Sequence, residues 1–472
     1  MTELRTKLVC TLGPASASPK MVRGMASAGV TIFRLNASHG TEQDHARAVE
    51  IVRDAEDAVG RTLAILGDLP GPKVRLGTLS PNPFRFQPGR AFRLRAEGEG
   101  DEEGAATTYP ELAYDLREGD RILLADGAVE LVVNAIEGAD VVAECVQGGT
   151  AYSGQGINVP AERLGLPAVT DRDRRALATM LELGVDLVAQ SFVREASDIE
   201  ELRDAMGERA LPIVAKIETK PAVERIDRIL EVADGLMVAR GDLGVELPME
   251  EIPLLQKDLL RAARSAGRPC IVATQMLESM IRAPRPTRAE ATDVANAVLD
   301  GADAIMLSGE TAIGDHPFVA TSAAIRIART AEQRGAAYRA REPACTHSSI
   351  GAAVAHAAAA IAEDAPGVVA ITCYTETGRT ARLLAAERPG VPIFAFIPNP
   401  DVRRACELLW GVRPLPAEPP ADTDEMISLM DLGLRVRGLA HDGDHVVMAA
   451  ASPAGKTTTN MVKVHVAGSP IR

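Results

Sequence analysis

Functional side chains recur at two-residue spacing in several short apolar segments of this chain. In VTIFRLNASHG, the spacing places Arg34, Asn36 and Ser38 on one face of a strand, because alternate residues of a β-strand point to the same side. The same spacing pairs Lys216 with Glu218 in PIVAKIET, and Arg240 with Asp242 in LMVARGDLG. We therefore expect basic groups and carboxylates to gather at the ends of otherwise apolar strands.

These residue types suit metal-assisted chemistry on a phosphorylated anion. Magnesium prefers hard oxygen ligands and usually takes one or two carboxylates, so Glu218 with Asp242 is a candidate magnesium site. Lys216 adds a positive charge for a phosphate group. Groups for proton transfer come from VATQM, with Thr274, and from MLSGET, with Ser308 and Glu310. One such pair alone is usually a surface ion pair, but functional side chains at six strand ends favour an active site.

Eight short, β-rich apolar segments could position these residues. They are KLVCTLG, VTIFRLNASHG, TLAILGDLPG, VDLVAQSF, PIVAKIET, GLMVARGDLG, PCIVATQM and AIMLSGET. Strands that alternate with helix-length stretches are typical of parallel β/α units, and eight of them favour a closed (β/α)8 TIM barrel over an open sheet. Active sites of such barrels lie at the carboxyl ends of the strands, which is where these segments carry their polar residues.

The alternation of strands and helices breaks twice, which predicts three domains in an α/β protein. Residues 70–164 are rich in Pro and Gly and contain strand-like segments such as RAFRLRA and ADVVAEC. They predict an all-β lid domain inserted after the third barrel strand. Residues 1–69 and 165–335 then form the barrel domain. Residues 336–472, with an alanine-rich helical segment followed by GVVAITC, VPIFAFI and HVVMAAA, form a C-terminal α/β domain.

Composition and charge argue against several other classes of protein. The 472 residues are 46% hydrophobic and 25% charged, as is typical of globular proteins. The formal net charge of −14 gives no broad positive field for a nucleic-acid backbone, so we expect no nucleic-acid partner. We also expect no membrane partner, because no apolar stretch reaches about 18 residues and no signal peptide is visible. The six cysteines lack zinc-ligand spacing, which favours a reducing cytoplasmic location.

Longer strings of this sequence resemble the pyruvate kinase family, in order and over essentially the whole chain. They are TLGPAS, FRLNASHG, GPKVR, GLPAVTDRD, KIET, MVARGDLGVELP and ATQMLESMIRAPRPTRAEATDVANAVLDGADAIMLSGETAIGDHP. The resemblance implies a homotetrameric, allosteric enzyme of glycolysis that transfers the phosphoryl group of phosphoenolpyruvate to ADP, giving pyruvate and ATP. It also implies Mg²⁺ as the cofactor, with Mn²⁺ as an alternative, and direct transfer that leaves an enolate to be protonated.

The resemblance implies roles for individual residues of the barrel. Arg34 and Lys216 would contact the transferring phosphoryl group, and Thr274 would lie beside the enolate. Glu218 and Asp242 would hold the catalytic magnesium. The implied substrate contacts are the backbone amides around Ala239, Arg240 and Gly241, together with Asp242 and Thr274. The implied contacts to the nucleotide phosphates are Asn36, His39 and Arg75.

The lid combines one match to the family with one departure from it. Asp126, in LLADGAVEL, matches the aspartate that meets the barrel when the lid closes. Gln155, in SGQGINVP, stands where many members carry a lysine that reaches the nucleotide phosphates. Because Gln155 carries no charge, the resemblance does not imply that the lid contacts the nucleotide phosphates at this position.

A second departure concerns a monovalent cation. Asn36, Ser38 and Asp68 match residues that bind potassium in many members, but Leu69 replaces a Thr and Lys73 replaces a glutamate. The ammonium of Lys73, on its flexible stem, can supply the charge of the ion. The resemblance therefore implies that potassium is not required. The alternative is that Lys73 is a solvent-exposed lysine at the lid hinge.

Two C-terminal segments, CYTETGRTA and SPAGKTTT, match the effector pocket of the family. Thr375, Thr377, Arg379 and Thr380 stand at the start of a helix whose N-terminal amides suit an anion, such as a sugar phosphate or a nucleoside monophosphate. An ordinary strand-to-helix turn is the alternative. SPAGKTTT is not a second nucleotide site, because Ala450 stands where a P-loop requires its first Gly.

Two other functions remain to be weighed against a kinase. A magnesium-dependent carbon–carbon lyase on a related barrel would share the carboxylate pair but lack the β insertion and the nucleotide groups Asn36 and His39. A non-catalytic sensor of phosphorylated metabolites would be expected to have lost Lys216 or a metal carboxylate. Both groups are present, so the sequence favours the kinase.

Overall fold

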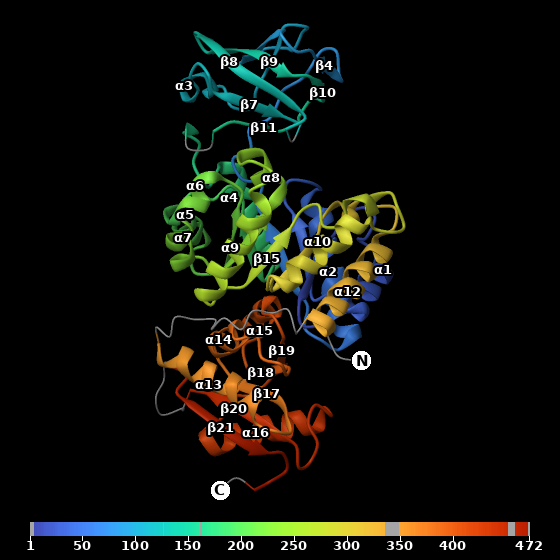
Figure 1. The fold of residues 1–472 in the computed structure, drawn as a ribbon, viewed down its shortest axis with the longest axis vertical. Coiled ribbons are helices and arrows are strands. Elements are labelled where there is room, and N and C mark those ends of the chain that lie inside the picture. The colour runs from blue at the N-terminus through green and yellow to red at the C-terminus, as the bar shows by residue number, and fades with distance from the viewer. Residues whose placement is uncertain (1–3, 126, 161–162, 336–348, 452–457, 471–472) are drawn as a thin grey trace.

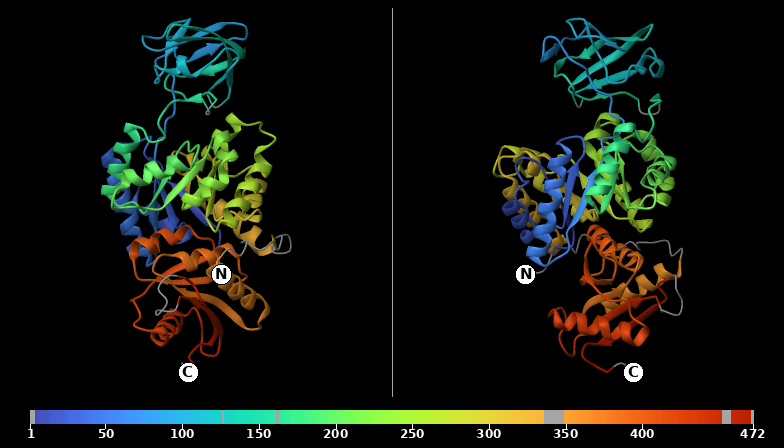
Figure 2. Two further views of the ribbon diagram at one scale, coloured as in Figure 1. Left: turned by 90° about the vertical axis from the view of Figure 1, so that its left-hand side faces the viewer. Right: turned by 180° about the vertical axis from the view of Figure 1, so that it is seen from behind.

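The computed structural model describes residues 4–125, 127–160, 163–335, 349–451 and 458–470. Figure 1 shows three parts along the long axis of the molecule, with a β-rich domain at one end, a barrel in the middle and an α/β domain at the other end. The two further views in Figure 2 show the same arrangement. The β-rich domain is joined to the barrel by only two chain crossings, one on the way in and one on the way out.

The predicted barrel is confirmed as a closed parallel barrel of eight strands in the order β1-β16-β15-β14-β13-β12-β3-β2. Its strands are β1 (Lys7–Thr11), β2 (Ile32–Asn36), β3 (Ala64–Asp68), β12 (Leu187–Gln190), β13 (Ile213–Ile217), β14 (Gly235–Ala239), β15 (Cys270–Ala273) and β16 (Ala304–Leu307). Every one of them lies within a segment that the sequence predicts. Their near-continuous apolar character follows from burial on both faces.

The helices around the barrel begin where side chains can cap them. Thr41, Thr170 and Thr287 each accept a hydrogen bond from the backbone three residues on, and an acidic side chain at that position bonds back to the threonine amide. The helices are α1 (Pro19–Ala28), α2 (Glu42–Val59), α4 (Asp171–Leu183), α5 (Ala196–Met206), α6 (Lys220–Glu224), α7 (Ile226–Val232), α8 (Arg240–Glu246), α9 (Ile252–Ser265), η2 (Glu278–Ile281), α10 (Arg288–Leu299), α11 (Gly309–Ala312) and α12 (Pro317–Arg334).

Alternate residues of the barrel strands pack into one apolar layer inside the barrel. In β13, for example, Val214 belongs to this inner layer, whereas Ile213 and Ala215 pack against the outer helices. Because side chains alternate along a strand, the residue two positions after each inner residue also faces inward. The inner layer therefore sets the direction of the side chains that continue these strands, such as Arg34, Asp68 and Lys216.

The inserted domain has its own strands and its own core. A six-stranded sheet runs β11-β7-β8-β9-β5-β6, and a two-stranded sheet pairs β10 with β4. Phe84, Phe86 and Phe92 meet in its core with ring centroids 4.8 to 5.1 Å apart. Its elements are β4 (Phe84–Phe86), β5 (Ala91–Arg95), β6 (Gly104–Ala106), α3 (Leu112–Asp115), β7 (Arg121–Leu124), β8 (Val129–Glu137), β9 (Asp140–Gln147), β10 (Gly149–Ala151) and β11 (Ile157–Asn158).

The C-terminal domain is a five-stranded sheet with helices, as predicted. Its strands run β19-β18-β17-β20-β21, and only the edge strand β21 is antiparallel to its neighbour. The elements are α13 (Ile350–Asp364), β17 (Val368–Tyr374), α14 (Arg379–Ala386), β18 (Ile393–Ile397), α15 (Pro400–Ala405), η4 (Cys406–Leu408), β19 (Val412–Pro416), α16 (Thr423–Val436), β20 (His445–Ala450) and β21 (Met461–Val466).

The C-terminal domain closes the amino-terminal end of the barrel. Leu408, from η4, belongs to the same buried cluster as the inner side chains of the barrel strands. Beside it, Asp303 accepts two hydrogen bonds from Arg388 at 2.8 Å and one from the Trp410 amide at 3.2 Å. This end of the barrel is thus filled by protein, so the open end is the carboxyl end.

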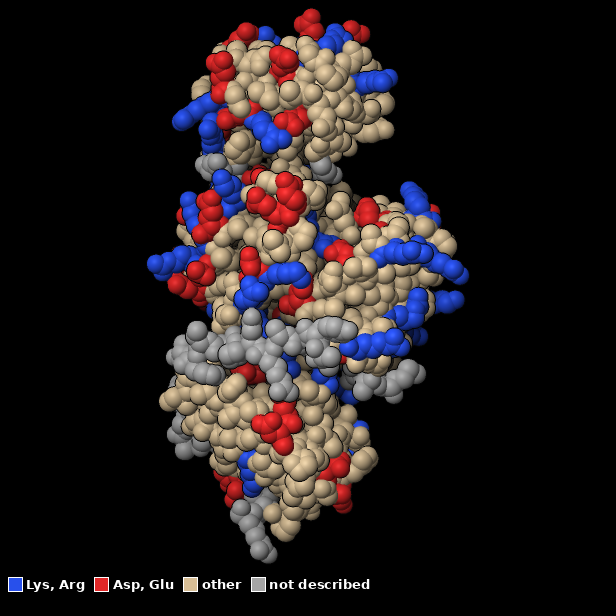
Figure 3. Space-filling model, viewed as in Figure 1, with Lys and Arg blue, Asp and Glu red and all other residues tan. Residues whose placement is uncertain are grey.

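Charged side chains are spread over the three parts of the molecule. On the face in view in Figure 3, acidic and basic side chains are mixed on the β-rich domain, whereas Lys and Arg predominate along the right-hand side of the barrel. Among the described residues, no helix is both long enough and apolar enough to cross a membrane.

Candidate active site

The strand order brings Arg34, Asp68 and Lys216 together at the carboxyl end of the barrel. β2 pairs with β3, so Arg34 and Asp68 lie on neighbouring strands, and both continue the inner face of their strand. The Arg34 Nε donates to Asp68 Oδ2 at 2.6 Å, and its guanidinium also donates to Thr11 Oγ1 at 3.1 Å. Lys216 Nζ lies 3.4 Å from the other oxygen, Asp68 Oδ1. One buried carboxylate therefore orients two cations.

The charges around Asp68 keep it ionised. Its side chain is 1% exposed, and burial alone would raise the pKa of its carboxyl, but the charges of Lys216 and Arg34 outweigh burial and lower that pKa. Burial would likewise lower the pKa of the Lys216 amine, yet Asp68 and Glu218 outweigh it and raise that pKa. Lys216 therefore remains a cation despite its burial.

Glu218 lies directly beside Lys216. The Lys216 ammonium is 2.9 Å from Glu218 Oε1, while Glu218 Oε2 accepts a hydrogen bond from the Phe192 amide at 2.6 Å. Burial raises the pKa of the Glu218 carboxyl; the Lys216 charge opposes this shift, and the charge of Asp242 adds to it. The buried Glu218 and the partly exposed Asp242 thus repel each other, an arrangement that a divalent cation between them would relieve.

The donor set of Glu218 and Asp242 fits a divalent cation. Both side chains offer hard oxygen atoms, and Asp242 follows β14 in the first turn of α8. Among the described residues no group of three or more His, Cys, Asp or Glu side chains could hold a metal. Two carboxylates with the remaining positions left to substrate and water is the usual pattern for magnesium. Asp242 Oδ1 is at present 3.1 Å from the Lys73 ammonium.

Thr274 and Gly241 face each other across β15 and α8. Thr274 has a positive φ of 69°, an uncommon conformation for a non-glycine residue. The Gly241 amide donates to Thr274 Oγ1 at 2.8 Å, and Arg240 donates to the Thr274 carbonyl at 2.7 Å. Arg240 is further held by Asp293 at 2.6 Å. The hydroxyl of Thr274 is thereby held at the first turn of α8, against the residue that precedes Asp242.

Glu310 is occupied by backbone groups. Its side chain is buried, and its two carboxylate oxygens accept the amides of Leu277 at 2.9 Å and Ser308 at 2.7 Å. These contacts tie the segments after β15 and β16 together. The geometry thus gives Glu310 a bridging position between two strand ends, with Ser308 bonded to it through the main chain.

The predicted nucleotide residues lie on the rim of the barrel and at the lid. Asn36 Oδ1 accepts the Ser38 amide at 3.0 Å, and the His39 amide donates to the Asn36 carbonyl at 3.1 Å. His39 itself is exposed. Arg75 lies on the strand that enters the lid and donates to the Gly154 carbonyl at 3.0 Å. The other lid residue, Asp126, lies outside the described residues.

The two chain crossings between barrel and lid pair as a ribbon. The Leu76 amide donates to Gln155 at 2.8 Å, and the Ile157 amide donates to Val74 at 2.8 Å. Lys73, at the start of this ribbon, extends its ammonium to Asp242 on the barrel. A charged contact therefore joins the lid hinge to the candidate metal site.

The predicted effector residues surround the start of α14 in the C-terminal domain. Thr375 and Thr380 are buried, and Thr380 Oγ1 lies 2.7 Å from Thr459 Oγ1. Thr377 and Arg379 are exposed at the same helix end. Residues 452–457, most of the segment SPAGKTTT, lie outside the described residues.

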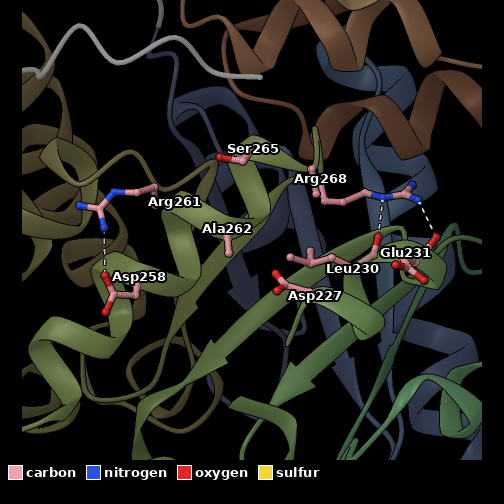
Figure 4. A pocket seen from close by; sticks show the side chains of 9 residues that line it. Asp227, Leu230, Glu231, Asp258, Arg261, Ala262, Ser265 and Arg268 are labelled. Carbon is pink, nitrogen blue, oxygen red and sulfur yellow. Dashed lines mark hydrogen bonds and ion pairs between the residues drawn. The ribbon is translucent and has the colours of Figure 1, made fainter. Parts of the chain in front are cut away.

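A hollow of about 650 Å³ lies elsewhere, between α7 and α9 on the outside of the barrel (Figure 4). Several of the polar side chains that line it interact with other lining residues. Arg261 pairs with Asp258 at 2.9 Å, and Arg268 donates to the carbonyls of Leu230 and Glu231 at 3.3 Å. None of the predicted site residues lines this hollow, so it is separate from the candidate active site.

The sequence reasoning missed Ser191, whose hydroxyl lies 2.7 Å from the Lys216 ammonium. The signal was present in VDLVAQSF, because Leu187, Ala189 and Ser191 repeat the two-residue spacing. It also missed Thr11, which lies two residues after the inner residue Val9 and bonds Arg34. The two-residue spacing, applied to every predicted strand, identifies both Ser191 and Thr11.

Comparison with known proteins agrees with this site. The family model described as pyruvate kinase, barrel domain, matches residues 3–321, and the model described as pyruvate kinase, alpha/beta domain, matches residues 352–465. The pyruvate kinase of Mycobacterium intracellulare is 44% identical over 98% of both chains. The pyruvate kinase of Corynebacterium glutamicum is 42% identical over 99% of this chain and 98% of its own. The chain therefore belongs to the pyruvate kinase family and is a phosphotransferase of that type.

Proposed function

We propose that this enzyme transfers the phosphoryl group of phosphoenolpyruvate to ADP, yielding pyruvate and ATP in the last step of glycolysis. The observation that carries the proposal is the cluster of Arg34, Lys216 and Asp68 beside the carboxylates Glu218 and Asp242, at the open end of the barrel. Phosphoryl transfer depends mostly on positioning and on neutralising the charge of equatorial oxygens, and this cluster provides both.

Glu218 and Asp242 would hold magnesium, or manganese in its place. When bound, the ion would neutralise negative charge on the phosphoryl group and on the enolate. Arg34 and Lys216 would contact the phosphoryl oxygens from the other side, held in place by Asp68. Because their carboxylate partner is buried, these cations are oriented before the substrate arrives, which lowers the reorganisation needed in the transition state.

The substrate carboxylate would bind at the start of α8, at the amides of Ala239, Arg240 and Gly241. In the present geometry the Gly241 amide donates to Thr274, so a bound carboxylate would take over that donor, while the hydroxyl keeps its own hydrogen bond to the Ala273 carbonyl at 2.6 Å. Thr274 would then lie beside the enolate and assist its protonation together with water. Ser308 and Glu310 are the remaining candidates for a proton path, although the backbone bonds of Glu310 favour a bridging role.

The nucleotide would lie on the rim, where Asn36, His39 and the lid residue Arg75 would contact its phosphates. Asp126 would meet the barrel on lid closure. The lid comprises residues 70–164 in this proposal, between the barrel segments 1–69 and 165–335, with the C-terminal domain at 336–472.

Potassium independence is part of the proposal. Asp68 already has two protein cations, Arg34 and Lys216, and Lys73 adds a third on a flexible stem nearby at Asp242. Asn36, Ser38 and Asp68 would therefore need no monovalent ion. The test is activity with magnesium in a buffer whose only monovalent cation is tetramethylammonium. Strong rescue by potassium would contradict this part, whereas Lys73→Glu should create a potassium requirement.

Allosteric activation by a phosphorylated metabolite would use the start of α14. The exposed Thr377 and Arg379 offer a hydroxyl and a cation there, with Thr375 and Thr380 packed behind them. Activation through this site requires a second conformational state, and a homotetramer would supply it. The exposed Val464 and Val466 on β21 support self-association, because β21 is the last strand of its sheet, and a sheet edge with apolar side chains is a ready surface for a second copy. We place the enzyme in the cytoplasm.

The proposed reaction is tested by a coupled assay for pyruvate formed from phosphoenolpyruvate with ADP and magnesium. The parent enzyme should form pyruvate, and Glu218→Gln should need far more magnesium to do so, because one anionic oxygen ligand is lost. An absence of pyruvate with every phosphorylated effector tried would overturn the proposal. An unchanged magnesium titration in Glu218→Gln would show that the metal ligands are different.

A further inference from the structure

The turn formed by Ser191 and Phe192, directly after β12, lies between the lid hinge and the charged cluster. Ser191 continues the inner face of β12 and is 3% exposed. Phe192 adopts a positive φ of 56°, which for a bulky residue is strained and persists only where surroundings enforce it. The surrounding structure therefore holds this turn in a single conformation, although that conformation is unfavourable for Phe192 itself.

Each residue of the turn forms a hydrogen bond with one of two charged residues in the segment KIET, Lys216 and Glu218. Ser191 Oγ is 2.7 Å from the Lys216 ammonium, and the Phe192 amide donates to Glu218 at 2.6 Å. These contacts follow from the register of the two strands, because β12 pairs with β13 and Gln190 lies opposite Ala215. One short turn thus holds both the candidate phosphate-binding lysine and the candidate metal carboxylate.

The direction of the Ser191 hydrogen bonds is settled by the chemistry of its partners. A lysine ammonium has donors only, so Ser191 Oγ must accept from Lys216. Its own hydrogen is then free for the Leu69 carbonyl, which lies 2.7 Å away. The result is a chain of hydrogen bonds from Lys216 through Ser191 to Leu69, the residue that precedes the lid.

The turn also packs tightly against the hinge. A side-chain carbon added at Gly71 would lie 2.7 Å from Ser191 Cβ and 2.8 Å from the Phe192 ring, both closer than van der Waals contact allows. Gly71 has a φ of 70° and its amide donates to Asp173 at 2.8 Å. The hinge backbone therefore lies directly on the turn.

Ser191 differs from the other two acceptors of Lys216 because it is neutral. Glu218 and Asp68 attract the ammonium by charge, at 2.9 and 3.4 Å, and both also interact with other cations or candidate cations. The serine oxygen adds direction without neutralising the lysine, so the positive charge remains available to an anionic substrate. It is also the acceptor whose strength does not depend on whether Glu218 holds a metal.

From these observations we propose that Ser191 is a positioning residue of the reaction: its hydroxyl orients the Lys216 ammonium and ties it to the lid hinge through Leu69. The inference rests on the proposed function, in which Lys216 contacts the phosphoryl group. Because Ser191 acts through Lys216, its loss should lower kcat and leave the KM for phosphoenolpyruvate nearly unchanged.

The test compares three substitutions of one residue in the full-length enzyme. Ser191→Ala removes the acceptor, and Ser191→Cys keeps the shape while offering only a weak acceptor. Both should lower kcat about 10- to 100-fold, the range expected when a transition-state contact is misplaced. Ser191→Thr keeps a hydroxyl and should retain most of the activity. Mn²⁺ binding measured without substrates should be unchanged in Ser191→Ala, because both metal carboxylates remain.

A matched control removes a buried hydroxyl far from the site. Thr372 donates to the Phe394 carbonyl at 3.0 Å within the C-terminal sheet, so Thr372→Val should lower the thermal midpoint and leave kcat unchanged. The proposal is overturned if Ser191→Ala or Ser191→Cys keeps kcat within about twofold of an active parent. It is also overturned if Ser191→Thr has the thermal stability of the parent but is as slow as Ser191→Ala. A parent without pyruvate formation would instead overturn the proposed reaction.

Discussion

The contact between Lys73 and Asp242 predicts that this lysine competes with the divalent cation. Its ammonium lies 3.1 Å from Asp242 Oδ1 and 5.8 Å from the centre of the Phe192 ring. A divalent cation that binds Asp242 must displace this ammonium or share the carboxylate with it. We therefore expect Lys73→Met to bind Mn²⁺ more tightly than the parent in the absence of substrates.

The size of the effect follows from the geometry of the ion pair. Two unit charges 3.1 Å apart attract by roughly 5 kcal/mol at an effective dielectric constant of about 20. The side chains of Lys73 and Asp242 are 23% and 24% exposed, so solvent screening, desolvation and lost rotamer freedom offset most of this attraction. A net value on the order of 1 kcal/mol remains, which is about fivefold in the dissociation constant.

The assay is a titration of free Mn²⁺ by electron paramagnetic resonance, which reports binding directly. Lys257→Met is the matched control, because Lys257 also pairs with a carboxylate, Asp300, but lies on the outer helix α9. Lys73→Met should tighten Mn²⁺ binding and also lower turnover, since the proposed charge near the phosphoryl group is lost. Equal or weaker Mn²⁺ binding in Lys73→Met would refute the competition, and equal tightening in Lys257→Met would show a general charge effect.

Four other changes should have separable outcomes. Lys216→Met should lower kcat by about 10³-fold or more in a protein whose circular dichroism is that of the parent; retained turnover would exclude its role at the phosphoryl group. Asp242→Asn should raise the magnesium concentration for half-maximal activity about tenfold or more, and a superimposable titration would remove Asp242 from the metal site. Arg379→Ala should abolish activation by phosphorylated effectors at unchanged saturated kcat; persistent activation would place the effector elsewhere. Leu408→Ala should lower the free energy of unfolding by about 2–5 kcal/mol, and a value near zero in denaturant would mean that the barrel end does not depend on this contact.

Much of the fold could be predicted because its signals are local. The eight barrel strands lie within the eight predicted segments, since strands buried on both faces need continuous apolar runs. The inserted β domain was visible as an interruption of the alternation, and the helix starts at Thr41, Thr170 and Thr287 carry capping signatures. Residues such as Lys216 and Glu218 could be found by spacing alone, because the two-residue period is a property of any strand.

Other parts of the site depend on distances that no local pattern contains. Asp68 meets Arg34 because β2 pairs with β3, and it meets Lys216 because β12 alone separates β3 from β13 in the barrel. For Glu310, the Ser308 amide is a local partner, but only the closed barrel brings the Leu277 amide to its other oxygen. The position of Lys73 at Asp242 likewise depends on how the hinge lies on the barrel.

The sequence by itself determined which side chains share a strand face and that these faces end in charge, because the alternation of side chains is built into the extended backbone. It also determined the family, through long ordered strings. Only the tertiary structure decided which strands are neighbours, which cation each carboxylate holds, and that Leu408 of the C-terminal domain fills the barrel end. The physical reason is that these contacts join residues far apart in sequence, and their partners are selected by closure of the barrel and by packing between domains.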